Sequence, residues 1–223
     1  MGIREWFRRA RRGKNENETP AEPAQNPQAE NAVAPEDVLD ADEIVAAEPA
    51  PRLNDMDFTD FWHDTRESER RHICPPADYR EVRDVEKELG VKLPASYVEL
   101  MKKHNGGLVN RCWFPARTPA KGFSDYIQIT DFLGIGSDAP YSLCGRFGSR
   151  FLEESYGHNP EIGIVICNTV RAGHALVMLD YRKCGVRGEP EVLYSNADTH
   201  EETTIAPDFE TFLRGLTTSS AIY

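Results

Sequence analysis

The chain has 223 residues, 39% of them apolar, and a formal net charge of −11. This acidic balance disfavours nucleic acid as a partner, since phosphate backbones need a basic face, and favours a basic protein. No apolar run approaches the roughly 20 residues that span a bilayer, and no signal peptide follows the charged N-terminus. The five cysteines are odd in number and far apart, which is typical of free thiols in a reducing compartment. We therefore expect a cytoplasmic protein.

The N-terminal quarter divides into a basic and an acidic part. Residues 1–14 carry six Lys or Arg and one acid, whereas residues 15–55 carry eleven acids and one Arg. Residues 2–12 fit either a short amphipathic helix that contacts a membrane surface or a disordered basic tail. The tail is favoured because so short a helix is marginal in water. Residues 15–55, rich in Pro, Ala and Glu, predict a disordered acidic linker.

The folded domain is predicted to cover residues 56–217, with 218–223 as a tail. Residues 56–73 favour a helix that ends before Pro75, since Phe58, Phe61, Trp62 and Thr65 can share one side. The next stretch, 78–103, predicts two helices. The apolar positions of these two helices are Val82, Val85, Leu89, Tyr97, Val98 and Met101.

The ends of these two helices are marked by the sequence. Asp78 caps the first helix, with Glu81 at the spacing of a capping box, and Gly90 suits the left-handed position at its end. Pro94 begins the second helix, where a missing N–H is harmless. Residues 105–107 are expected to end it because Asn and Gly tolerate a positive φ.

Strands follow the helical hairpin. We predict them at 111–115, 126–129, 162–167, 175–181 and 190–195, with loops at 137–145 and 182–189 and a turn at 168–174. Residues 146–156 are ambiguous and include a candidate short helix, and residues 207–216 predict a closing helix. Helices, then strands joined by hairpin-scale links, then a helix, indicate an α+β fold.

One ordered series of motifs resembles a known family. The series LGxxLPxxY and NGG resembles the opening signature of the SMI1/KNR4 (SUKH) family. The blocks GIGSDAPYSLCGRFGSRF, GIVIC, LDYRKCGVRGEPEV and IAPDFETFLRGL extend the resemblance from about Phe61 to Leu216. The resemblance implies a mixed, largely antiparallel sheet flanked by helices. The signature positions, to which we assign structural roles, are Gly90, Leu93, Pro94, Tyr97, Asn105, Gly106, Gly107 and Asp180.

The resemblance also implies a function. Bacterial members are commonly immunity proteins that bind and block polymorphic or contact-dependent toxins, often nucleases, and fungal relatives are scaffolds in cell-wall signalling. We therefore expect a non-enzymatic immunity protein with a cognate toxin as partner. The alternative is a scaffold or regulatory adaptor of the same fold, localised by residues 1–14. The chain departs from the family pattern at Ala175 and at 196–202, both at strand ends where a partner could bind.

No motif of the sequence predicts catalysis, a metal or a cofactor. There is no CxxC or HxxxH pair, no GxSxG and no GxxxxGK[ST], and the glycines at 134–136 and 145–148 are typical of turns. Cys167 ends an apolar strand and is expected to be a small buried residue. Asp180 follows another apolar strand; we expect it to hold the loop at 182–189 rather than to act as an acid or base, since no second carboxylate accompanies it.

A partner surface is predicted from large or charged residues in loops and at strand ends. Aromatic and arginine side chains dominate interface energetics. For Trp113, Phe114 and Tyr126, packing in the core is an equal alternative. The candidates are Trp113, Phe114, Tyr126, Asp138, Tyr141, Arg146, Arg171 and His174.

Overall fold

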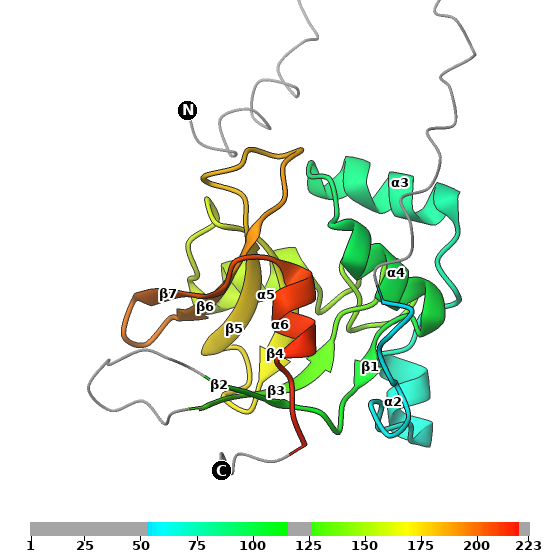
Figure 1. Cartoon of the computed structure of the whole chain (residues 1–223). Helices are drawn as coiled ribbons and strands as arrows, with labels where there is room; N and C mark the ends of the chain where they lie inside the picture. The colour runs from blue at the N-terminus through cyan, green and yellow to red at the C-terminus, as the bar shows by residue number, and fades with distance from the viewer. Residues whose placement is uncertain (1–52, 116–125, 219–223) are drawn as a thin grey trace, which may run out of the picture. The chain divides into compact units, whose positions relative to one another are not determined.

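The computed structural model describes residues 53–115 and 126–218, which Figure 1 shows in colour. The basic segment, nearly all of the linker and most of the C-terminal tail predicted above lie outside these residues. In chain order the elements are α2 (Arg66–Arg71), α3 (Tyr79–Leu89), α4 (Ala95–Lys103), β1 (Gly107–Leu108), β2 (Trp113–Pro115), β3 (Tyr126–Phe132), α5 (Ser149–Tyr156), β4 (Gly163–Thr169), β5 (Ala175–Asp180), β6 (Glu191–Asn196), β7 (Glu201–Ala206) and α6 (Phe209–Arg214).

Within the described residues, the strands form one seven-stranded sheet. Its order is β1-β3-β4-β5-β6-β7, and β2 pairs with β3 beside this path. Neighbouring strands are antiparallel throughout the described sheet. This confirms the α+β class and the largely antiparallel sheet that the sequence predicted.

Both faces of the central strands are covered. All six residues of β5 are buried, and successive side chains of a strand point to opposite faces. Cys167 pairs with both Phe132 and Val177, so these three side chains share the face on which α6 packs. Ser195 of β6, which pairs with Leu176, faces the other side, where it contacts the segment that follows α5. The sheet therefore lies between α6 and α5 (Figure 1).

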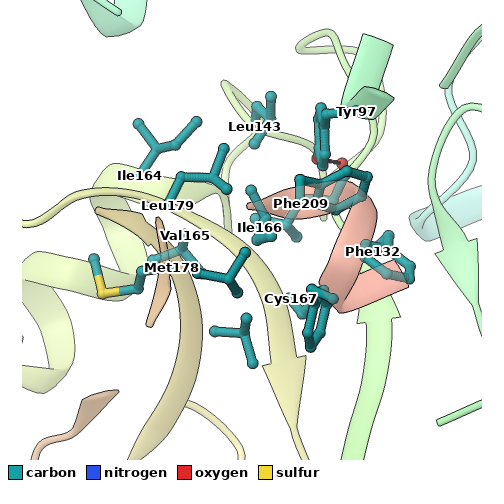
Figure 2. Packing of buried hydrophobic residues seen from close by; sticks show 14 of the residues in the cluster. Tyr97, Phe132, Leu143, Ile164, Val165, Ile166, Cys167, Met178, Leu179 and Phe209 are labelled. Carbon is teal, nitrogen blue, oxygen red and sulfur yellow. Dashed lines mark hydrogen bonds between the residues drawn. The ribbon is translucent and has the colours of Figure 1, made fainter. Parts of the chain in front are cut away.

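The core on the α6 face is aromatic. Tyr97 of α4 packs edge-on against Phe209 of α6, with ring centroids 4.9 Å apart, and Phe209 meets Phe132 of β3 in the same way. Tyr97 is fully buried, and its hydroxyl donates a hydrogen bond to the carbonyl of Leu133. Figure 2 shows these rings next to Leu143 and the β4 side chains, Cys167 among them. Cys167 is fully buried, as predicted.

The predicted ends of the helical hairpin are confirmed. The Asp78 side chain accepts a hydrogen bond of 2.8 Å from the Glu81 amide, and Gly90 ends α3 in the left-handed conformation with φ 76°. Pro94 occupies the N-cap of α4, and Leu93 before it is buried. These ends depend on contacts between near neighbours in the chain, which is why the sequence predicts them.

Two predictions about elements were wrong. Only Arg66–Arg71 of the predicted 56–73 helix is α-helical, because Thr65 and Ser68 form a capping box there and Asp60, with φ 56°, turns the chain before it. The segment before the helix instead pairs with the sheet, since Trp62 forms a β-bridge with Val109. Strand β7 was missed, because its sequence, EETTIA, has few apolar residues and lies at the edge of the sheet.

Candidate functional site

The loop at 134–148, between β3 and α5, has a fixed irregular shape. The amide of Leu143 donates to the carbonyl of Gly134 (2.8 Å), and the amide of Phe147 donates to the carbonyl of Pro140 (2.8 Å). The Tyr141 amide donates to the carbonyl of Arg71 (2.9 Å), which ties the loop to α2. Backbone hydrogen bonds of this kind hold exposed side chains in place before any partner arrives.

Asn105 clamps the start of this loop. Its side-chain nitrogen donates to the carbonyls of Pro75 and Ile135, and its side-chain oxygen accepts from the Ile135 amide at 2.7 Å. The helix α4 ends at Lys103, as expected, but of residues 105–107 only the two glycines have a positive φ, and Asn105 is instead a buried residue. The following Gly106 does adopt a positive φ of 84°, and a Cβ there would meet the backbone of His72 and Gly134.

Five side chains form a continuous aromatic and arginine surface around this loop, which we call the Tyr141 surface. Its members are Arg71, Tyr141, Arg146, Phe147 and Phe151. The Tyr141 and Phe147 rings lie 5.2 Å apart, as do the Phe147 and Phe151 rings. The guanidinium of Arg71 lies over the Tyr141 ring at 5.0 Å and donates to the tyrosine hydroxyl, and that of Arg146 lies over Phe147 at 5.1 Å. Phe151 is 40% exposed.

A half-buried histidine lies against the Tyr141 ring. His72 stacks on this ring with centroids 4.5 Å apart and planes 5° from parallel. Its Nδ1 lies 3.3 Å from Oδ2 of the buried Asp131, without the geometry of a hydrogen bond. Asp131 also accepts from Asn168 (3.1 Å) and Thr130 (2.6 Å). The Tyr141 ring is thus held by contacts with Arg71, His72 and Phe147.

Asp138 lies on the side of the loop that faces α3. Burial, together with the nearby charges of Asp138, Asp78 and Asp84, raises the pKa of Glu81. Asp138 therefore lies near other carboxylates. Arg146, the other exposed residue that the sequence selected in this loop, lies over the ring of Phe147.

Arg171 and His174 meet at a different end of the sheet, in what we call the Asp198 cluster. Arg171 donates to Asp198 Oδ2 and His174 Nδ1 contacts Oδ1, both at 2.8 Å. Hydrogen bonds from His174 and then Arg171 lower the pKa of Asp198. This cluster joins the β4–β5 turn to the β6–β7 turn, the segment where the chain departs from the family pattern.

A small pocket of about 210 Å³ lies near this cluster, lined by residues that include His158, Ser195 and Glu202. His158 Nε2 donates to the carbonyl of Gly173 and Nδ1 accepts from the Ser195 hydroxyl, both at 2.7 Å. Burial lowers the pKa of His158, despite an opposing effect of the bond to Gly173. The imidazole joins the β4–β5 turn to strand β6 and is satisfied on both nitrogens, which is a structural role.

The three candidates around β2 and β3 do not join either group. Phe114 is buried and packs on Phe212 at 4.9 Å, so it belongs to the core and its assignment to a partner surface is corrected. Trp113 and Tyr126 are half-buried and meet edge-on at 6.4 Å. They flank residues 116–125, which are outside the described part of the chain.

Asp180 has the structural role that the sequence indicated. Its carboxylate accepts from the backbone amide of Arg182 and, through both oxygens, from the guanidinium of the same residue at 2.7–3.2 Å. Burial alone would raise the pKa of Asp180, but these hydrogen bonds lower it. The carboxylate is therefore a fixed anion that holds the start of the 182–189 loop.

Within residues 53–115 and 126–218, no group of three or more His, Cys, Asp or Glu side chains is arranged to hold a metal ion. In the same part of the chain, no helix is long and apolar enough to span a membrane.

The structure is an α+β domain in which the loop at 134–148 presents the Tyr141 surface. The model of the SMI1/KNR4 family (SUKH-1) matches residues 76–215, from just before α3 to the end of α6. The chain belongs to this family. No curated protein sequence matches it.

Sequence reasoning selected Tyr141 and Arg146 but missed Arg71, Phe147 and Phe151. Arg71 comes from a helix about 70 residues away, and nothing in its local pattern points to the loop. Phe147 carried a usable signal, since it follows Arg146 between two turn glycines, where an apolar core position is not expected. Asp198 was missed because an aspartate in a turn is ordinary.

Proposed function

We propose that this chain is a non-enzymatic, cytoplasmic immunity protein that binds a cognate toxin through the Tyr141 surface and blocks it. Membership of the SMI1/KNR4 family supports the immunity role, because family members are generally non-catalytic immunity proteins. A nuclease is one candidate class of toxin.

The observation that carries the proposal is the form of the Tyr141 surface. Aromatic and arginine side chains supply most of the binding energy in protein interfaces. Here three rings contact one another in sequence, one tilted and one edge-on, next to a loop whose backbone is held by its own hydrogen bonds and by the Asn105 clamp. Such a surface loses little conformational entropy on binding, which favours a tight complex.

The test is co-expression of the full chain with the protein encoded next to it, followed by purification of the complex. We expect a one-to-one complex and an affinity loss of about 30-fold or more for Phe147→Ala, the effect of removing an interface hot spot. Val170→Ala is the control, because Val170 is an exposed apolar residue that adjoins Arg171 of the Asp198 cluster. A complex that both variants leave unchanged would contradict the choice of surface.

A second candidate is a scaffold or regulatory adaptor of the same fold. The observation that favours it is the basic character of residues 1–14, which are not matched by the family model. The adaptor would bind several partners more weakly and would depend on this segment for its location. Deletion of residues 1–14 distinguishes the two, since it should abolish adaptor function and leave toxin binding intact.

A further inference from the structure

The charge of the Tyr141 surface differs from that of the chain as a whole. The protein is strongly acidic, yet the charged members of this surface are two arginines. Net charge governs long-range steering, whereas the groups that are in contact decide which partner residues are accepted. The chemistry of the partner must therefore be read from the surface itself.

The two arginines are not equivalent. Arg71 already donates to Glu67 at 3.1 Å and to the Tyr141 hydroxyl at 3.1 Å. Arg146 is exposed, and among the described residues it has no carboxylate partner; its contact is the face of Phe147. A guanidinium that stacks on a ring keeps its N–H edge directed outward, and this edge is suited to two parallel hydrogen bonds with a carboxylate.

Resting on the function proposed above, we infer that the Tyr141 surface binds an acidic segment of the partner, in which a carboxylate meets Arg146 and an adjacent apolar side chain covers Phe147 and Phe151. The exposed Phe151 ring supplies the apolar contact. The ring contacts fix the distance between the charged and the apolar part of the recognised segment.

The Asp198 cluster does not meet these conditions. Arg171 and His174 share the carboxylate of Asp198. An anion from a partner would have to displace this residue, so the cluster offers no open cation.

The inference is tested with the full-length, isotope-labelled protein and three synthetic peptides of equal length. Each peptide contains the same phenylalanines, and the remaining positions are Glu and Asp, Gln and Asn, or Lys. We expect the acidic peptide to shift the NMR signals of residues 71, 141, 146, 147 and 151, and the other two peptides to leave them in place. Arg146→Gln should weaken this binding about fivefold or more, while Arg187→Gln, at an exposed position of the 182–189 loop, should not.

Several outcomes would overturn the inference. They are the absence of shifts with the acidic peptide at millimolar concentration, equal shifts with the lysine peptide, and equal binding by the Arg146→Gln variant. The same two variants, tested in the toxin complex, distinguish failure of this inference from failure of the proposed function. If Phe147→Ala weakens the complex and Arg146→Gln does not, the toxin binds at the Tyr141 surface but the inferred preference for an acidic segment is wrong.

Discussion

The Tyr141 surface and the Asp198 cluster both combine arginine with aromatic rings, but they differ in how their charges are satisfied. In the Asp198 cluster, Arg171 and His174 share one carboxylate within 2.8 Å. In the Tyr141 surface, the guanidinium of Arg146 contacts a ring instead. The first arrangement holds two turns together, and the second leaves binding capacity for another molecule. Residue type alone therefore does not identify a binding surface.

The largest expected effect concerns the support of the Tyr141 surface. Asn105→Ala removes three hydrogen bonds and leaves the buried Ile135 amide without its side-chain acceptor. We expect the free energy of unfolding to fall by about 3 kcal/mol or more, as measured by chemical denaturation.

The matched control for this change is Asn110→Ala, since Asn110 is exposed and makes one bond of 2.9 Å to the carbonyl of Trp62. It should cost less than about 1 kcal/mol. Equal losses in the two variants would mean that the Asn105 clamp does not support the loop.

The next effect concerns the ring that supports Tyr141. His72→Ala removes the parallel contact with Tyr141 and leaves Asp131 without its nearest imidazole. We expect partner affinity to fall about tenfold, because the Tyr141 ring loses the neighbour that lies parallel to it. The measurement is calorimetric titration with the co-purified partner. His200→Ala, at an exposed position of the β6–β7 turn, is the control, and a similar loss there would remove the contrast between the two regions.

A smaller effect concerns pH and the pocket near the Asp198 cluster. The pKa of His158 is lowered by burial from its ordinary value of 6.5, so the unfolded chain binds a proton more readily than the folded one. The stability that neutral His158 gives the folded state is therefore lost as the pH falls through 6.5 and below it. His158→Gln should reduce this dependence, as measured by thermal unfolding between neutral and mildly acidic pH. Parallel curves for the variant and the unmodified chain would contradict the assignment.

The smallest effect is expected at the Asp198 cluster itself. Asp198→Asn removes the exposed ion pair with Arg171 and weakens the exposed contact with His174, and such exposed contacts are screened by salt and contribute little to stability. Partner affinity should change less than about twofold, as measured by titration with the co-purified partner. A large loss would move the binding surface from the Tyr141 surface to this end of the sheet.

The fold could largely be predicted from the sequence, whereas the candidate site could be predicted only in part. The strands β3 to β6 and the helix α6 lie where apolar runs placed them, within a few residues. The prediction of a helix over 56–73 was wrong because an aromatic stripe alone does not reveal that Trp62 pairs with Val109. Among the site candidates, the assignment of Phe114 to a partner surface was wrong, because the sequence of a short strand gives no indication of which face packs on α6.

The sequence by itself determined the helical hairpin and its ends. The Asp78 cap and the left-handed Gly90 depend on interactions within four residues, so the local pattern contains their cause. Only the tertiary structure decided which side chains gather in the Tyr141 surface. Arg71 and Tyr141 are 70 positions apart and meet because the loop at 134–148 bonds to α2. Asn105, an ordinary turn residue in the sequence, becomes the clamp of that loop because folding buries it beside Ile135.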